Sequence, residues 1–341
     1  MKDKILFFSD AHIREVGSFL PWAKVVNGHG LTGELVNIKK SFTFIRSLIL
    51  ETQPRLVLFG GDWHHTTDFV TALTLHVSSI CHSMIVSACK EVGCEFWMFR
   101  GQHDLFSEQF NICSINIFAN ACTVIPSEKI KDIDGFKIGI LPYVSCKELA
   151  ISTLSEMSCK VDLLSTHLDF AGCSYETGKK SESVIPAKLG VPCLAGDQHL
   201  KQKVKDVRYC GSLYQNRFNR EDTEKAGGAI LFDMNTKKMK FYKNTLAKHY
   251  VKVSDLENVK NLNPDECVLQ VSTDNDRQEV EEVCSEFEHI FFPRPLFKND
   301  VEFQEEYVDT TIKEPKVLLR DYIKEDNPSA VEVYDKVIGK K

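Results

Sequence analysis

The sequence predicts an α/β protein, with a smaller α+β region at its C-terminal end. Short apolar runs alternate with longer amphipathic stretches, which is typical of strands alternating with helices. A chain of 341 residues that is 43% hydrophobic can bury one large core and a smaller second one. The charge balance also changes near residue 250, which indicates a separate tail.

The net charge of −6 argues weakly against non-specific binding to nucleic acid, because such binding depends on cations that face the phosphates. The charge is unevenly distributed. Residues 198–250 hold 12 Lys and Arg against 5 Asp and Glu, whereas residues 251–341 hold 12 against 22. The basic segment and the acidic tail therefore either have different roles or are two solvated surfaces of opposite sign.

The chain lacks the sequence signals of export and membrane insertion. No apolar run approaches the roughly 20 residues of a bilayer span, and residues 1–6 lack the apolar stretch of a signal peptide. We therefore expect a cytoplasmic protein with no membrane segment. The 12 cysteines are widely spaced and contain no CxxC pair, so we expect reduced, mostly buried thiols.

The predicted elements follow one another in a regular order. A helix at 36–51 is supported by apolar residues in a helical stripe, and Pro54 ends it. The glycine-containing residues 13–34 are a long loop. Predicted strands lie at 4–9, 56–59, 95–99, 122–126, 136–142, 161–166, 192–195, 207–210, 229–234, 239–242 and 250–253, and further helices at 69–92 and 147–157. The strands at 122–126 and 136–142 are assigned to a second layer.

The first polar motif follows the first predicted strand. Asp10 and His12 place a carboxylate and an imidazole at the end of that strand, where they can chelate one cation. Alone this pair is weak evidence, because Asp at a strand end is commonly a turn residue or a helix N-cap.

The stretch GGDWHH, residues 60–65, follows the second strand and is the centre of the predicted site. Its two glycines permit close backbone approach, and the carboxylate of Asp62 can bridge two cations. A neighbouring histidine can orient a substrate or donate a proton, and we expect this to be His65 rather than His64. Trp63 is expected only to pack.

Five predicted strands are each followed at once by acidic, imidazole or amide side chains. The motifs are DAH, GDWHH, GQHD, STH and GDQH, in that order. Independent surface turns would rarely produce this series, so we expect the motifs to converge on one site. No phosphate-binding loop, nucleophile elbow or dinucleotide-binding turn competes with them.

From Asp10 to His199 these motifs resemble those of the calcineurin-like metallophosphoesterase superfamily, and within it the SbcD family of DNA double-strand-break repair exonuclease subunits. The likeness to SbcD is carried by His65 three residues after Asp62, by VRYCGSLYQNRFNREDTEKAGG at 207–228, and by the acidic tail. The resemblance implies a four-layer α-β-β-α metallophosphoesterase sandwich over residues 1–253, followed by a small α+β capping domain.

The resemblance also implies two divalent metal ions, with Mn²⁺ expected and Mg²⁺ as the alternative. The first ion would be held by Asp10, His12 and His199. Asp62 would bridge the two ions. The second ion would also be held by Gln102, His167 and Asp197.

The implied chemistry is hydrolysis of phosphodiester bonds in DNA by a water that the two metal ions activate. His103 would stabilise the transition state or protonate the leaving oxygen, and His65 would position the substrate. The resemblance places this exonuclease and endonuclease activity in DNA recombination, repair, replication or end processing, in a bacterial or bacteriophage-infected cell.

Two positions depart from the family pattern, both at the second metal. Gln102 stands where the family has asparagine, and Asp197 stands where it has histidine. Both keep a possible ligand, but Gln is one methylene longer and Asp adds negative charge, so we expect a harder, more anionic site. The alternative is a second metal that binds poorly.

A basic segment after the last motif is a candidate DNA-binding track, in which cations contact the backbone and aromatic rings stack on bases. Its candidate residues are Lys201, Lys203, Arg208, Tyr214, Arg217 and Arg220. The alternating lysines in KQKVK also fit a solvated edge strand that is protected from aggregation.

The tail is predicted to contain a strand at 267–272, a helix at 276–289, a strand at 290–292 and an amphipathic helix at 316–325. By resemblance, residues 254–310 would form the DNA-capping domain. Residues 311–341 would dock on the coiled-coil base of an SbcC-like SMC-type ATPase, in a heterotetramer that contains a homodimer of this chain. The docking residues would be Leu318, Leu319, Tyr322 and Ile323, although these side chains also fit packing within their own domain.

Two other functions remain compatible with the sequence. One is a phosphomonoesterase or cyclic-nucleotide phosphodiesterase on the same metal scaffold. The other is a non-catalytic DNA-binding scaffold, which the missing asparagine would permit.

Overall fold

The computed structural model describes residues 3–15, 30–65, 70–215, 227–272, 277–287 and 290–291. The chain divides into two compact units, Met1–Leu296 and Phe297–Lys341. The second unit lies wholly outside the described residues. The predicted helix at 316–325 and the four predicted docking residues therefore fall outside them as well.

The first of two six-stranded sheets has the order β14-β13-β1-β2-β3-β6. Its strands are β1 (Lys4–Phe8), β2 (Leu56–Phe59), β3 (Glu95–Phe99), β6 (Thr123–Ile125), β13 (Gly228–Asp233) and β14 (Met239–Lys243). Strands β1, β2, β3 and β6 are mutually parallel. Strand β13 is antiparallel to β1, and β14 is antiparallel to β13. The strand predicted at 122–126 therefore belongs to this sheet, and its assignment to a second layer is wrong.

The second sheet has the order β11-β12-β10-β9-β8-β7. Its strands are β7 (Lys129–Ile133), β8 (Phe136–Leu141), β9 (Leu163–His167), β10 (Cys193–Gly196), β11 (Gln202–Val204) and β12 (Val207–Tyr209). The central strands β8, β9, β10 and β12 are parallel, and antiparallel strands close both edges. The edge strands β7 and β11 consist mostly of polar residues, so no apolar run in the sequence marks them as strands.

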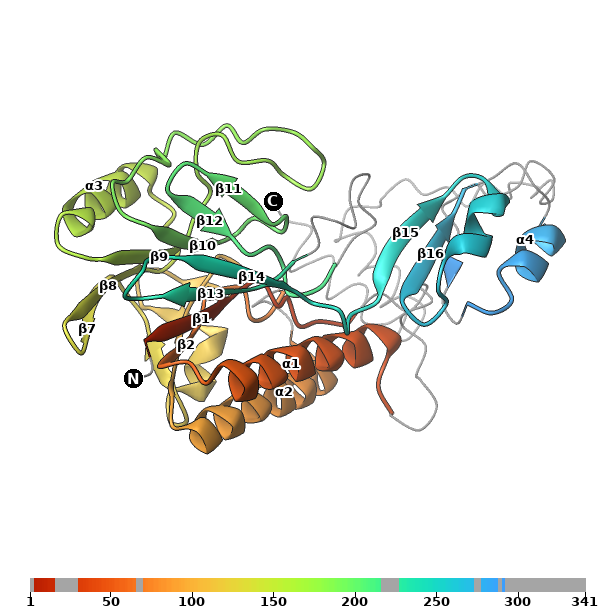
Figure 1. The fold of residues 1–341 in the computed structure, drawn as a ribbon, viewed down its shortest axis with the longest axis horizontal. Coiled ribbons are helices and arrows are strands. Elements are labelled where there is room, and N and C mark those ends of the chain that lie inside the picture. The colour runs from red at the N-terminus through yellow and green to blue at the C-terminus, as the bar shows by residue number, and fades with distance from the viewer. Residues whose placement is uncertain are drawn as a thin grey trace, which may run out of the picture. The chain divides into compact units, whose positions relative to one another are not determined.

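Three apolar clusters show which faces are covered. Leu6 and Phe8 of β1 pack with α1 (Gly33–Thr52) and α2 (Ala72–Val92), while Ile5 and Phe7 of β1 face the second sheet. Helix α3 (Lys147–Ser158) packs on the other face of the second sheet. In Figure 1, α1 and α2 run side by side beneath β1 and β2, and α3 lies beyond β8 and β9. The described fold is thus mixed α/β, with helices flanking the sheets, and both faces of β1 are buried, which explains its continuous apolar run.

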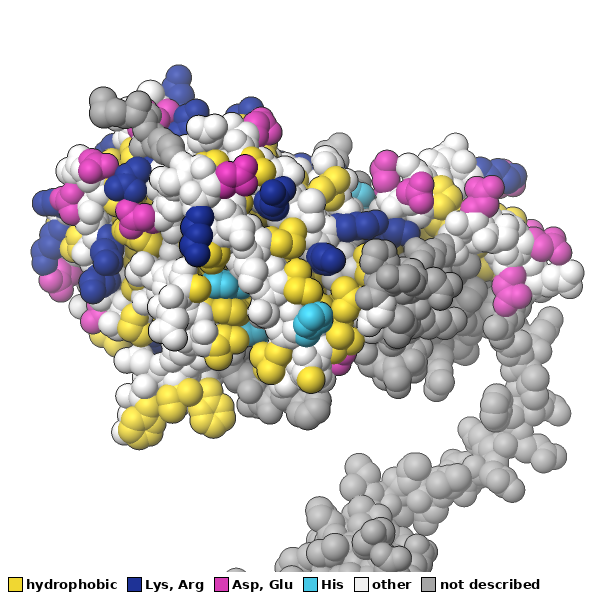
Figure 2. Space-filling view, turned by 90° about the horizontal axis from the view of Figure 1, so that it is seen from below, with side chains coloured by type: hydrophobic (Ala, Val, Ile, Leu, Met, Phe, Trp, Pro, Cys, Tyr) yellow, Lys and Arg dark blue, Asp and Glu magenta, His cyan; other side chains and the backbone are white. Residues whose placement is uncertain are grey.

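Helix α2 is long and apolar enough to span a membrane by length and composition alone. Core helices of folded domains meet the same criterion, and α2 packs against α1 and the first sheet in one apolar cluster. On the face seen from the side of α1 and α2, hydrophobic side chains lie scattered among basic and polar ones (Figure 2). The packing of α2 in this cluster is that of a core helix on a sheet.

A three-stranded parallel sheet is formed by β15 (His249–Val253), β16 (Cys267–Val271) and β17 (Ile290–Phe291). Helix α4 (Arg277–Val283) is shorter than the helix predicted at 276–289. Because β15 pairs with β16, the predicted domain boundary after residue 253 separates two strands of one sheet. All 12 cysteines are free and eight are buried, which confirms the prediction of mostly buried thiols.

Candidate metal centre

The five polar motifs meet at one edge of the paired sheets. Strands β1, β2 and β3 are parallel neighbours in the first sheet, and β9 and β10 are parallel neighbours in the second. The carboxyl ends of parallel strands lie at the same edge, so the loops that follow them are brought together. Two groups of the predicted ligands have their ligand atoms within 4.8 Å of one another: Asp10, His12 and His199, and Asp10, Asp62 and His167. A third such group joins His12 with His65 and His103.

Asp62 lies between the two predicted metal sets. Its Oδ2 is 3.7 Å from His12 Nε2 and 3.2 Å from His167 Nε2. His12 Nε2 lies 2.9 Å from His199 Nε2. Asp10 belongs to both groups of potential ligands, so two buried carboxylates, rather than Asp62 alone, can bridge two cations.

His167 has the geometry of a metal ligand. Its Nδ1 lies 2.7 Å from the carbonyl oxygen of Gly60, which only accepts, so Nδ1 must carry a proton and donate. In neutral His167 the lone pair is then on Nε2, which is fully buried and lies 3.2 Å from the Asp62 carboxylate, itself a metal-ligating group. A buried nitrogen whose partner ring atom is fixed by a backbone carbonyl is the arrangement that orients histidine ligands toward a metal.

The charge of the cluster also fits a cation. Burial raises the pKa of Asp10, and it raises the pKa of Asp197 to about 6, with the carboxylates of Asp10 and Asp62 adding to the shift at Asp197. Burial opposes the charged form of His167, but the neighbouring Asp62 carboxylate raises its pKa above the ordinary value. Several carboxylates buried close together favour a divalent ion, because it offsets their mutual repulsion.

The ligand turns are held in a backbone conformation that side chains disfavour. Asp10, His12, Asp62 and Asp197 have φ values of 55°, 42°, 59° and 92°, and they are four of the nine non-glycine residues with positive φ in the described part of the chain. Hydrogen bonds between the first two loops hold two of these turns, from Asp10 N to Gly61 O (3.0 Å) and from His12 N to Asp62 O (2.9 Å). Strain of this kind concentrates at functional sites.

Two glycines permit the loops to approach so closely. A Cβ atom on Gly101 would strike the carboxylate of Asp62, and one on Gly61 would strike the His167 ring. Gly61 also has a φ of 97°. The glycines of these motifs therefore create the space in which the ligands meet.

Asp104, to which the sequence analysis gave no role, ties the second loop to the third. Its fully buried carboxylate accepts hydrogen bonds from the backbone N–H groups of Asp62 (2.8 Å), Trp63 (3.2 Å), His64 (3.0 Å) and Gly101 (3.0 Å). Burial raises its pKa to about 6, with the carboxylate of Asp62 adding to the shift. Asp104 is thus a positioning residue for Asp62.

His64 and Trp63 point away from the cluster. His64 is buried and hydrogen bonds to the hydroxyls of Ser114 (2.8 Å) and Ser78 (2.9 Å). Trp63 is also buried, and its Nε1 donates to Ser78 (2.8 Å). Both side chains fasten the second loop to α2.

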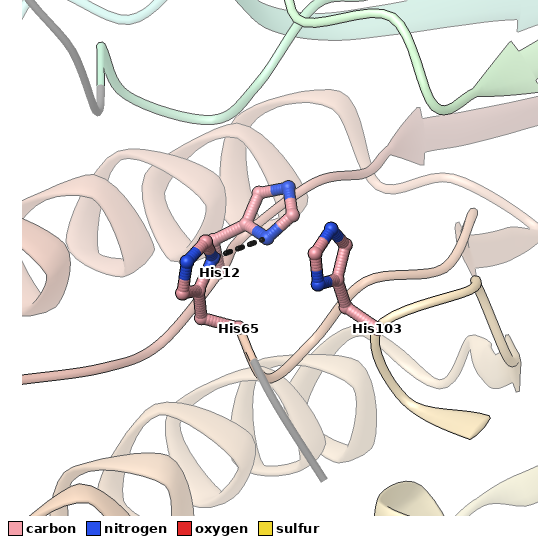
Figure 3. Close-up of side chains that lie close together, drawn as sticks. All are labelled: His12, His65 and His103. Carbon is pink, nitrogen blue, oxygen red and sulfur yellow. Dashed lines mark hydrogen bonds between the residues drawn. The ribbon is translucent and has the colours of Figure 1, made fainter. Parts of the chain in front are cut away.

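His65 and His103 lie beside His12 (Figure 3), and both are less buried than His12. The rings of His65 and His103 are stacked at a centroid distance of 5.1 Å, and His103 N donates to Asp62 Oδ1 (2.8 Å). His65 Nδ1 lies 3.3 Å from His12 Nδ1. Arg14 donates to His65 Nε2 (2.9 Å). Both predicted catalytic histidines are therefore adjacent to the candidate ligands, and Arg14 is a neighbour that the motifs did not reveal.

The two residues that depart from the family pattern are placed differently. Asp197 Oδ1 lies 4.0 Å from His167 Nε2, and Asp197 N donates to Asp10 Oδ1 (3.1 Å). Gln102 is exposed in the turn after β3, and its side chain makes no hydrogen bond to the cluster residues that the structure describes. The structure thus brings together six of the seven predicted ligands and leaves Gln102 outside.

Glu176 is a partner of His199 that sequence reasoning missed. His199 Nδ1 lies 3.2 Å from Glu176 Oε1. Burial alone would lower the pKa of His199, but the Glu176 carboxylate raises it above the ordinary value. Glu176 lies in the long loop between β9 and β10, where no periodic or motif signal marks it.

The four predicted DNA-binding residues that the structure describes have different surroundings. Tyr214 is only 2% exposed and its hydroxyl donates to His12 O (3.2 Å), so the prediction that its ring stacks on a base is wrong. Lys201 covers the Phe241 ring at 4.6 Å, whereas Lys203 and Arg208 line a separate pocket. The predicted residues Arg217 and Arg220 lie outside the described residues.

No family model and no curated protein sequence matches this chain. Among solved structures, an archaeal phosphodiesterase is 12% identical, with a TM-score of 0.33 over 70% of this chain and 97% of its own. The phosphoesterase Yfce from E. coli is 11% identical, with a TM-score of 0.31 over 69% and 96%. GAP50 of Plasmodium, named as an inner membrane complex anchor, is 10% identical, with a TM-score of 0.37 over 70% and 88%. With likenesses this low, the functional conclusion depends on the site's own residues.

Proposed function

We propose that this protein is a metal-dependent phosphoester hydrolase. The observation that carries the proposal is the convergence of Asp10, His12, Asp62, His167 and His199 from four separate loops, with the buried Nε2 of His167 lying 3.2 Å from Asp62 Oδ2. The succession of helices, two sheets and a third helix supports the inferred four-layer metallophosphoesterase sandwich.

The residues fit two divalent ions. Asp10, His12 and His199 would hold one, and Asp62, His167 and Asp197 would hold the other, with Asp10 or Asp62 shared. Bound divalent ions would lower the pKa of a water and neutralise charge on the phosphate. The mixture of carboxylate oxygens and imidazole nitrogens suits Mn²⁺, with Mg²⁺ as the alternative.

The side chains around the cluster supply binding and proton transfer. His103 is placed by its backbone hydrogen bond to Asp62, and it is the group we assign to the leaving oxygen, as a proton donor or as a stabiliser of developing charge. His65, held by Arg14 and stacked on His103, would contact a non-bridging phosphate oxygen.

The substrate we propose is DNA, cut by exonuclease and endonuclease activity in a complex with an SbcC-like ATPase. The support is the set of motifs shared with the SbcD family and the basic segment that follows the last of them. Residues 311–341 would dock on the ATPase. Deletion of residues 311–341 should abolish co-purification with such a partner and spare basal hydrolysis, whereas retained co-purification would refute the docking.

The proposal is tested by incubating the purified chain with Mn²⁺ or Mg²⁺ and three substrates: linear double-stranded DNA, single-stranded DNA and a chromogenic phosphodiester. We expect metal-dependent cleavage of all three and its loss in EDTA. Cleavage of the chromogenic substrate alone would support the proposed phosphoester hydrolase activity and contradict the proposed nuclease activity. No cleavage of any substrate, together with DNA binding, would replace the hydrolase by a DNA-binding scaffold.

A further inference from the structure

A second polar site lies at the opposite end of the second sheet. A cavity of about 410 Å³ is lined by the loop before β10, by the turn between β11 and β12, and by the start of β14. Pro192 and Asp206 in this lining precede the strands β10 and β12, whereas the metal cluster lies where β10 ends. The cavity is therefore remote from the candidate metal centre and lies between the edges of the two sheets.

The lining is strongly basic. It contains four cations, Lys203, Lys205, Arg208 and Lys237, and one acid, Asp206. The carboxylate of Asp206 already accepts hydrogen bonds from the N–H groups of residues 189 (2.7 Å) and 190 (2.9 Å). Lys237 also lies 3.3 Å from Asp162, but neither Lys203 nor Lys205 makes an ion pair with any described residue.

The close placement of these cations lowers the stability of the strand pair that carries two of them. Lys203 and Arg208 are directly opposite each other on β11 and β12, so their side chains lie on the same face of the sheet. Like charges in that arrangement destabilise strand pairing. Arg208 is also fixed, since it donates to the carbonyl oxygens of Lys205 (2.7 Å) and Val207 (3.0 Å). A bound anion would remove the repulsion.

Protection of an edge strand explains only part of this pattern. β11 is the edge of its sheet, and lysines there discourage pairing with another chain. Arg208, however, lies on the next strand inward, and Lys237 comes from the other sheet. Neither protects the edge of β11, yet both line the same cavity.

We propose that this cavity is a binding site for a phosphate group, separate from the metal cluster. Lysine ammonium groups and the planar guanidinium of Arg208 are the donors that proteins use for phosphate. The phosphate can belong to a free nucleotide or to the backbone of a nucleic acid. The site depends on neither the metal ions nor the proposed hydrolysis.

The test is a binding measurement on the full chain in EDTA at low salt, with fluorescent ATP and a short labelled single-stranded DNA as probes. The double variant Lys203→Gln with Arg208→Gln should weaken the binding of at least one probe by about tenfold and reduce its salt dependence. The matched control is Lys129→Gln with Lys147→Gln, which removes two exposed cations, one on β7 and one at the start of α3. It should change binding less than about twofold, as expected for exposed charges distant from the bound phosphate.

A second variant, Lys205→Gln with Lys237→Gln, guards against misfolding of the first and should show the same loss. A loss for ATP and DNA together identifies a site for free or terminal phosphates, and a loss for DNA alone identifies a backbone site. Unchanged binding in both pocket variants, or an equal loss in the control, overturns the proposal. The Lys205→Gln with Lys237→Gln variant should hydrolyse the chromogenic phosphodiester as the unaltered chain does, so failure of hydrolysis and failure of this site are separate results.

Discussion

The two sides of the candidate metal centre differ in how firmly burial and hydrogen bonds hold their predicted ligands. One side contains Asp10 and His12, and the other contains Asp197 and Gln102. On one side, Asp10 and His12 are fully buried and their turns are hydrogen bonded to the loop that carries Asp62. On the other side, the backbone N–H of Asp197 is hydrogen bonded to Asp10 (3.1 Å), but its carboxylate lies 4.0 Å from His167 Nε2, and Gln102 is exposed. A ligand that comes from a short side chain on a tight turn is fixed by the backbone, whereas a longer side chain such as Gln102 needs its own partners to be fixed.

The largest effect is expected at the residue that joins the two sides. Asp62→Ala should lower the turnover of the chromogenic phosphodiester by at least about a thousandfold, because the variant loses the carboxylate shared between His12 and His167. Thermal unfolding should show that the chain still folds. Near-normal hydrolysis in this variant would contradict the assignment of the site.

His103→Ala should lower turnover by about a hundredfold to ten thousandfold, the range of a lost general acid. Metal binding, measured by calorimetry, should stay close to that of the unaltered chain, because His103 is assigned to the substrate and not to the ions. Equal loss of metal affinity would instead make His103 a ligand, in the group that His12, His65 and His103 form.

Asp104→Asn should destabilise the fold by about 2 kcal/mol or more, since an amide group would face several N–H donors that now share a carboxylate. Denaturant unfolding measures this loss. Turnover should fall as well, because the backbone of Asp62 is released. Asp132→Asn is the matched control, since its carboxylate accepts one exposed hydrogen bond, and its effect should be below about 0.5 kcal/mol.

Glu176→Gln should lower the affinity for the divalent ion by about tenfold to a hundredfold, as expected when the partner of a histidine ligand loses its charge. Calorimetric titration with Mn²⁺ would show it. Glu182→Gln, an exposed acid of the same loop that pairs with Lys179, is the control and should leave the affinity unchanged. Equal affinity in both variants would show that Glu176 does not support His199.

The smallest effect is expected at Gln102. Because its side chain is exposed and apart from the cluster, Gln102→Ala should change metal affinity and turnover by less than about twofold. A loss comparable to that of Asp197→Ala would show that Gln102 swings inward when the ions bind. In that case the side of the centre that contains Asp197 and Gln102 would hold its ligands as firmly as the side that contains Asp10 and His12.

The sequence predicted the strands and the converging motifs well, because buried strands have continuous apolar runs and their polar residues follow at once. Glu176 and Arg14 could not be found in this way. Each acts through a neighbour that is distant in sequence, and no spacing rule links the two, although Arg14 follows the DAH motif by two residues. Tyr214 was misread because an aromatic residue in a basic segment fits either a buried core position or a stacking surface, and the sequence does not distinguish them.

The left-handed turns at Asp10, His12 and Asp62 have a consequence for how this chain tolerates change. Glycine adopts that conformation without strain, so a glycine at any of these positions would relax the backbone. Selection for stability alone would therefore move these positions toward glycine. A screen for thermostable variants without added metal should therefore enrich inactive proteins that carry glycine at these positions.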